Sequence, residues 1–167
     1  LMEKFPADKS ESLTAGAVLA RLACGAKADD EIVKKGIDLC SKCLPSWNEG
    51  AGTIDFYYWY LGTRAEFAAG GPARWPKWRD ALVRALVENQ RPVKDEDGAG
   101  SWDPADPWGQ DGGRVYSTAI NLLALAVAFH HVGYNADVPA AGGDDELDGR
   151  VGVREGRGLG RHDDNLL

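Results

Sequence analysis

The stretch Val93–Val132 reads VKDEDGAGSWDPADPWGQDGGRVYSTAINLLALAVAFHHV, and the rest of the chain is organised around it. It begins as a polar, glycine-rich loop that carries two tryptophans, Trp102 and Trp108. It continues directly into a helix, Tyr116 to Val132, that is apolar on almost every side. A helix that is apolar all round is a buried helix. We therefore expect the loop to be pinned down just before a helix of the core.

Four more helices are predicted upstream of this stretch. They run from about Ser12 to Cys24, onward from Asp29 or Asp30, from Thr53 to about Ala69, and from about Trp75 to Gln90. Apolar and amphipathic helices alternate along the chain. This alternation predicts an all-α fold of αα-hairpin repeats, with an inner and an outer layer of helices. A short internal repeat agrees with it, since Leu13-Thr14-Ala15 and Ser117-Thr118-Ala119 open two of the apolar helices.

The third helix contains a run of consecutive aromatic residues, from Phe56 to Tyr60. Local propensity alone favours a strand for such a run. We predict a helix, because the helical pattern continues through Ala69 before two glycines. Asp55, which precedes the run, is expected to cap the helix by accepting hydrogen bonds from its first N–H groups. The alternative role for Asp55 is that of a general acid in an apolar cavity.

Composition narrows the functional classes. The chain has 167 residues and a net charge of -7, which argues against nucleic acid as a partner because phosphate contacts need clustered Lys and Arg. The longest apolar run, Leu122 to Phe129, is too short for a transmembrane span. Charged residues near the start argue against a secretory signal. We expect a soluble protein, cytoplasmic or peripheral to a membrane rather than secreted, and the compartment stays open. A first residue other than Met suggests a fragment.

The three cysteines, Cys24, Cys40 and Cys43, do not form a disulfide framework, because their number is odd. We expect them to act as small buried hydrophobes, with no metal and no cofactor. A zinc site of Cys40, Cys43 and one of the histidines His130 and His131 is the alternative. Residues 1–139 are predicted to form the helical domain. Residues 140–167 are rich in Gly and Asp and lack periodicity, which predicts a disordered tail.

Residues 12–134 resemble the repeats of squalene and oxidosqualene cyclases and of protein prenyltransferase β-subunits. The resembling segments are Leu13-Thr14-Ala15-Gly16, Lys35-Gly36-Ile37, Tyr58-Trp59-Tyr60-Leu61-Gly62-Thr63, Gln90, Gly100-Ser101-Trp102 and Tyr116-Ser117-Thr118-Ala119. The resemblance implies an α/α toroid, in which an inner barrel of helices lies inside an outer one. The chain holds roughly two and a half helix pairs, so we expect an incomplete toroid. An open arc also predicts self-association or docking to further repeats.

The resemblance also implies roles for individual residues. Gln90, Gly100 and Trp102 fit the Q…G-x-W motif that ties an outer helix to the next inner one, although the spacing from Gln90 to Gly100 is longer than usual. Four aromatic residues are candidates for a substrate-binding cavity wall: Phe56, Tyr57, Trp59 and Tyr60. Ordinary helix packing is the alternative for these four, because adjacent residues of a helix point about 100° apart and cannot all face one cavity.

The function implied by the resemblance is the binding of an apolar polyprenyl or triterpene substrate, an isoprenoid. The Asp-x-Asp-Asp motif of the cyclases and the Asp, Cys and His zinc ligands of the prenyltransferases are both missing from the predicted inner helices. We therefore expect a catalytically incomplete domain, which if active would be a terpene cyclase, an isomerase or lyase. A non-enzymatic scaffold that binds proteins is the alternative. An α/α-toroid glycoside hydrolase, which needs two inward-facing acids, is the third possibility.

Overall fold

The computed structural model describes residues 10–94 and 97–129. This part of the chain contains helices and no strand, which confirms the predicted all-α class. The helices are α1 (Glu11–Ala23), α2 (Glu31–Cys40), α3 (Phe56–Ala69), α4 (Gly71–Val87) and α5 (Gly109–Phe129). The expected tail 140–167, the histidines at 130 and 131, and the domain boundary at 139 lie outside the described residues.

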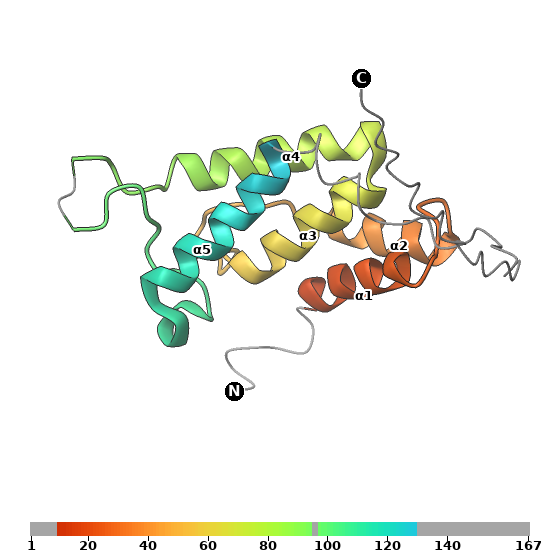
Figure 1. Cartoon of the computed structure of the whole chain (residues 1–167), viewed down its shortest axis with the longest axis horizontal. Coiled ribbons are helices and arrows are strands. Elements are labelled where there is room, and N and C mark those ends of the chain that lie inside the picture. Colours follow the sequence, from red (N-terminus) through yellow and green to blue (C-terminus); the bar gives the residue numbers. More distant parts are fainter. Residues whose placement is uncertain (1–9, 95–96, 130–167) are drawn as a thin grey trace, which may run out of the picture.

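The helices lie in two layers, with α3 at the centre (Figure 1). Helices α1 and α5 pack on opposite flanks of α3, so that α1, α3 and α5 form one layer. Helix α2 packs on α1 and α3, and helix α4 packs on α3 and α5. The second and fourth helices thus lie apart from the layer of α1, α3 and α5.

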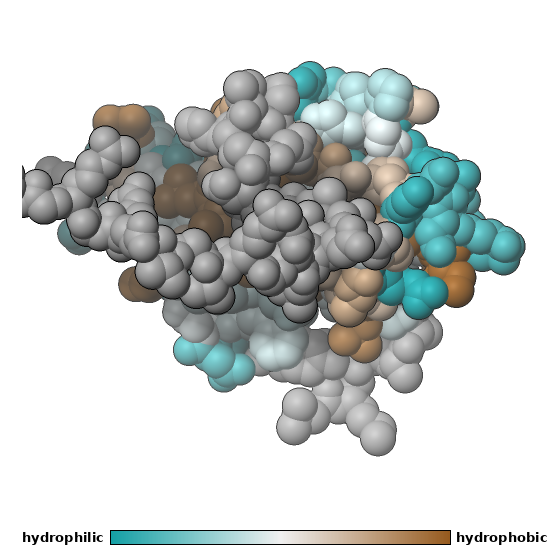
Figure 2. Space-filling model, turned by 45° about the vertical axis from the view of Figure 1, so that its right-hand side comes forward, coloured by the Kyte–Doolittle hydropathy of each residue, from teal (hydrophilic) through white to brown (hydrophobic). Residues whose placement is uncertain are grey.

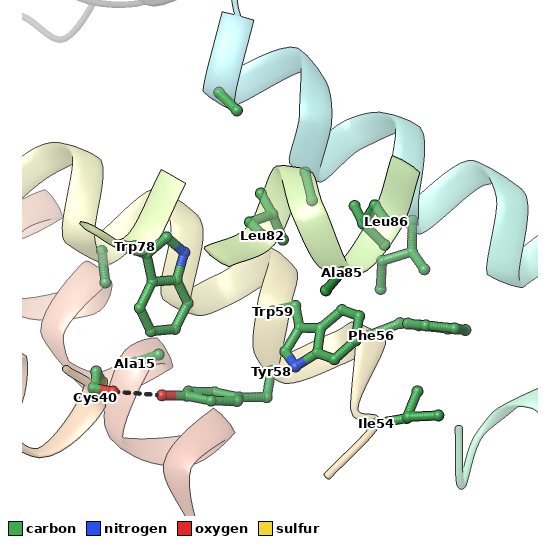
Figure 3. Packing of buried hydrophobic residues seen from close by; sticks show 14 of the residues in the cluster. Ala15, Cys40, Ile54, Phe56, Tyr58, Trp59, Trp78, Leu82, Ala85 and Leu86 are labelled. Carbon is green, nitrogen blue, oxygen red and sulfur yellow. Dashed lines mark hydrogen bonds between the residues drawn. The ribbon is translucent and has the colours of Figure 1, made fainter. Parts of the chain in front are cut away.

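Helix α3 begins at Phe56 because Asp55 caps it. The Asp55 carboxylate accepts a hydrogen bond of 2.8 Å from the backbone N–H of Tyr58, which confirms the predicted cap. Phe56, Tyr58 and Trp59 are all buried. The Tyr58 hydroxyl donates a 2.9 Å hydrogen bond to the carbonyl of Cys40 at the end of α2 (Figure 3). The aromatic run therefore stabilises a helix by packing in three directions, which a strand would not allow.

Trp78 joins α4 to α3 at a glycine. A Cβ atom at position 62 would lie 2.6 Å from the indole ring of Trp78, so only glycine permits this approach. The buried Trp78 N–H donates a 2.9 Å hydrogen bond to the hydroxyl of Thr63. Figure 3 shows Trp78 on the same helix as Leu82, Ala85 and Leu86, which face the aromatic side chains of α3.

Three predicted helix starts are wrong. Helix α3 begins at Phe56 rather than Thr53. Helix α4 begins at Gly71 rather than Trp75 and contains Pro76; the indole of Trp75 packs on Phe67 with ring centroids 5.1 Å apart, which holds this early turn against α3. Helix α5 begins at Gly109 rather than Tyr116. It is broken at Gly113, whose φ of 63° and ψ of -166° are not helical. Glycine adopts this backbone without strain, so the chain turns there into the long helical part.

Several apolar side chains of α5 are exposed to solvent. Val115 and Phe129 of α5 are 82% and 61% exposed, and Leu122 between them is half exposed. Figure 2 shows hydrophobic patches beside strongly hydrophilic ones on one face of the molecule. By length and composition alone, α5 would pass as a membrane-spanning helix, which is weak evidence because core helices of soluble proteins pass the same test. The expectation of no transmembrane span therefore stays a prediction.

Candidate functional site

The loop between α4 and α5 is tied to both helices by Trp102. Its ring is completely buried, and its indole N–H donates a 2.8 Å hydrogen bond to the carbonyl of Leu86 in α4. Its backbone N–H donates to the hydroxyl of Thr118 in α5, at 3.3 Å. The side-chain amide of Gln90 donates to the carbonyl of Gly100, at 2.7 Å. Gln90, Gly100 and Trp102 thus lie together at the junction of an outer and an inner helix.

Backbone hydrogen bonds close the base of this loop, where Arg91 pairs with Gly100 and Ser101. Its N–H donates to the carbonyl of Ser101 at 2.9 Å, and its own carbonyl accepts from the N–H of Gly100 at 3.0 Å. Gly100 has a φ of 73°, a conformation that glycine adopts at little cost. The carboxylate of Asp103 pairs with both Arg91, at 3.2 Å, and Arg114 of α5, at 2.7 Å. These contacts fix the direction in which the segment after Asp103 leaves.

Replacing Gln90 with alanine should weaken this base without unfolding the chain. The Gln90 side chain is exposed, so the loss of its hydrogen bond to Gly100 should cost about 1 kcal/mol of unfolding free energy. Urea denaturation of the Gln90→Ala and Gln90→Glu variants measures this. Gln90→Glu keeps the side-chain size but cannot donate, so it should lose about as much as alanine. A loss below about 0.3 kcal/mol in both variants would show that the hydrogen bond contributes nothing.

The loop segment after Asp103 places Trp108 beside the start of α3. The rings of Tyr57 and Trp108 lie with their centroids 6.1 Å apart and their planes at 65°. Both rings are partly open to solvent, with exposed fractions of 41% and 39%. They line a hollow of about 520 Å³ together with Asp111, Gly112 and Tyr116. We call this the aromatic hollow; its walls come from α3, the loop and α5.

A buried carboxyl group lies behind the aromatic hollow. Asp106 is 3% exposed, and its carboxylate accepts a 3.2 Å hydrogen bond from the hydroxyl of Tyr116. Burial raises the pKa of Asp106 to about 6, against the opposing effect of this hydrogen bond; the negative charge of Asp55 adds to the rise. Burial likewise raises the pKa of Asp55 and that of Tyr116. The hollow is therefore backed by carboxyl groups that are hard to ionise.

The four aromatic residues proposed as a cavity wall do not lie together. Phe56 and Trp59 are in the core, where both rings contact Trp47 at centroid distances of 5.5 and 6.2 Å. Tyr60 is half-buried, with the guanidinium of Arg64 5.7 Å from its ring centroid. Of the four, Tyr57 alone lines the aromatic hollow.

Sequence reasoning missed Trp108 and Tyr116 as wall residues. Their only signal is that each flanks the glycine-rich segment 109–113, where the backbone turns into α5. The cysteines give no metal site in the described part of the chain: no group of three His, Cys, Asp or Glu side chains lies close enough there to hold an ion. Cys40 is buried, whereas Cys24 and Cys43 are exposed rather than buried as expected.

Comparison of the chain with protein-family models, with curated proteins and with solved structures finds no match. Its function is therefore inferred from its own residues, chiefly those of the aromatic hollow and of the loop that carries Trp102.

Proposed function

We propose that this chain is a helical repeat domain of the cyclase and prenyltransferase type, which binds an apolar polyprenyl or triterpene ligand on its inner helices without cyclising it. The observation that carries the proposal is the aromatic hollow at the junction of α3 and α5. Its volume of about 520 Å³ falls in the range of about 300–1,000 Å³ that small-molecule sites occupy. Its walls are mainly aromatic, which suits an apolar ligand.

The charges around the hollow favour a ligand without a diphosphate group. Among the residues that the structure describes, no Lys or Arg lines it, and Asp111 does. Asp106 lies directly behind Tyr116, with its carboxylate 3.2 Å from the tyrosine hydroxyl. A diphosphate needs cationic or N–H partners and would here meet carboxylates instead. Between the two branches of the resemblance, this supports the cyclase type, whose substrates lack the charged group, over the prenyltransferase type.

We do not expect this chain alone to cyclise its ligand. Protonation of an alkene requires an acidic group in contact with the ligand. Asp106 has the raised pKa of a proton donor, yet it is buried and does not line the hollow. Asp55 caps α3 through the N–H of Tyr58. Asp55 thus serves a helix start and Asp106 accepts from Tyr116, which also argues against the paired acids of a glycoside hydrolase.

Binding can be tested with three probes that share a hydrocarbon chain. The full chain should bind farnesol in calorimetric titration, and should bind farnesyl diphosphate at least about tenfold more weakly, because the diphosphate meets carboxylates. Tyr57→Ala should weaken farnesol binding by about tenfold, since a partly exposed ring contributes on the order of 1–2 kcal/mol of contact. Incubation with squalene, the third probe, should give no cyclised product by mass spectrometry.

Tyr60→Ala is the matched control, because Tyr60 lies on the same helix and does not line the aromatic hollow. Its farnesol affinity should equal that of the unmodified chain. Tighter binding of the diphosphate than of farnesol, equal losses in both tyrosine variants, or a cyclised product from squalene would each contradict the proposal.

A protein-binding scaffold is the second candidate function. It is favoured by the apolar strip of α5, where Val115, Leu122 and Phe129 are exposed on one side of the helix. Spacings of seven residues place these side chains on a common face. This face points away from the buried face of α5, which includes Ile120 and Ala124. Failure of both farnesol and farnesyl diphosphate to bind would favour this second candidate.

A further inference from the structure

The apolar strip of α5 follows the spacing of a helix-packing seam. Two exposed alanines complete it, so that its members recur at alternating intervals of four and three residues: Val115, Ala119, Leu122, Ala126 and Phe129. All five are exposed to solvent. Apolar residues at these intervals form the line along which two helices pack in a coiled coil. The strip therefore has the pattern of a surface that receives another helix.

The opposite side of α5 is already covered within the chain. The buried residues after the break at Gly113 all lie outside the strip: Ser117, Ile120, Asn121, Ala124, Val127 and Ala128. Among the described helices, α5 packs on α3 and α4 and stands at the edge of its layer, with α1 at the other edge (Figure 1). No charged residue follows Arg114 in this helix. A helix that is apolar on both sides is typical of one that is covered on both.

The sizes of the side chains in the strip favour a second α5 as the partner. Small and large residues alternate along it. In an antiparallel pair of such helices, each alanine faces a large side chain: Ala119 of one copy lies opposite Leu122 or Phe129 of the other. Every layer then combines one small and one large residue, which fills the space evenly. A parallel pair would place alanine on alanine and leucine on leucine, with gaps and crowding in turn.

We propose that the apolar strip of α5 binds the same strip of a second copy of this chain, with the two helices antiparallel. Both copies then use the same surface about a two-fold axis, as in most protein dimers. The flanking residues are uncharged, so the copies meet without like-charge repulsion: Tyr116, Thr118, Leu123 and Leu125. The pair extends the layer of α1, α3 and α5 into the second copy, and it does not depend on a ligand in the aromatic hollow.

The dimer should be weak and should depend on Leu122. One helix pair buries less than the roughly 1,600 Å² of a standard interface, so we expect a Kd on the order of 10 µM. Sedimentation equilibrium of the full chain over about 1–300 µM measures it. Leu122→Ala should raise the Kd by about tenfold or more, because it leaves layers that contain only alanine. Leu39→Ala is the matched control: Leu39 on α2 is 53% exposed, against 52% for Leu122, and its loss should leave the Kd unchanged.

Ala119→Leu separates this packing from general apolar adhesion. The substitution adds apolar surface, yet it should raise the Kd by about tenfold or more, because a leucine opposite a large side chain holds the helices apart. Adhesion without defined packing, or a parallel pair, would gain from the added leucine. Ala20→Leu is the control, since Ala20 is an exposed alanine of α1 at the other edge of the layer, and it should leave the Kd unchanged. Circular dichroism of each variant checks that it folds.

Several outcomes would overturn the proposal. They are a monomer at every concentration, equal losses in Leu122→Ala and Leu39→Ala, and a tighter dimer in Ala119→Leu. Cosedimentation of the chain with phosphatidylcholine vesicles and loss of the dimer in their presence would instead assign the strip to a membrane surface. Farnesol binding by a chain that stays monomeric would leave the proposed function standing, and a dimer that binds no farnesol would leave this proposal standing.

Discussion

Trp102→Ala should lower the free energy of unfolding by about 3–5 kcal/mol, the usual loss when a large buried aromatic side chain is truncated. The ring of Trp102 is completely buried, and its N–H is bonded to the carbonyl of Leu86 at 2.8 Å. Truncation leaves a cavity between α4 and α5 and removes the hydrogen bond as well. The loss is a large share of the roughly 5–15 kcal/mol that stabilises a typical domain. Urea denaturation followed by far-UV circular dichroism measures it.

Trp102→Phe separates the two contributions. Phenylalanine retains most of the apolar ring and cannot donate to Leu86, so about 1–2 kcal/mol should be lost. The alanine variant should also lose ligand binding at the aromatic hollow, because Trp102 anchors the loop that carries Trp108. A loss of less than about 1 kcal/mol in Trp102→Ala would show that Gln90 and the Asp103 ion pairs hold the loop without it.

The layers of this fold are predictable from the sequence because they follow from helix periodicity. Helices α2 and α4 carry polar residues on one side, and α1, α3 and α5 are more apolar, so their order along the chain predicts which helices share a layer. The aromatic run of α3 is the instructive exception. The run forms a helix despite its strand propensity, because Asp55 caps the helix and because Tyr58 and Trp59 pack in different directions. Periodicity beyond the run indicates this outcome; propensity within it does not.

The candidate site is less predictable because its residues come from separate segments. Tyr57 and Trp108 are far apart in the sequence, and their contact depends on the loop base at Arg91 and on the break of α5 at Gly113. Neither the loop base nor the helix break produces a repeating pattern of apolar residues from which it could be predicted. The burial of Asp106 is a further example, since an acidic residue in a loop is usually solvated.

Asp106 should make the chain more stable at acidic than at neutral pH. Its pKa is about 6 in the folded chain, against 3.8 for an ordinary aspartate. Between these two values the folded chain retains a proton that the unfolded chain has lost, so stability falls as the pH rises. The contribution is complete below pH 3.8 and lost above about pH 6. A change of this size in pKa corresponds to about 3 kcal/mol. Asp55 and Glu66, whose pKa values burial also raises, act in the same direction.

Asp106→Asn tests this effect, because asparagine is uncharged throughout that range. The difference in unfolding free energy between the variant and the unmodified chain should shift by about 3 kcal/mol in favour of the variant from pH 4 to pH 7.5, whatever its value at pH 4. Tyr116→Phe is the paired variant: the hydroxyl of Tyr116 stabilises the ionised form of Asp106, so its removal should extend the fall in stability to higher pH. Parallel pH profiles for Asp106→Asn and the unmodified chain would show that Asp106 ionises alike in both states.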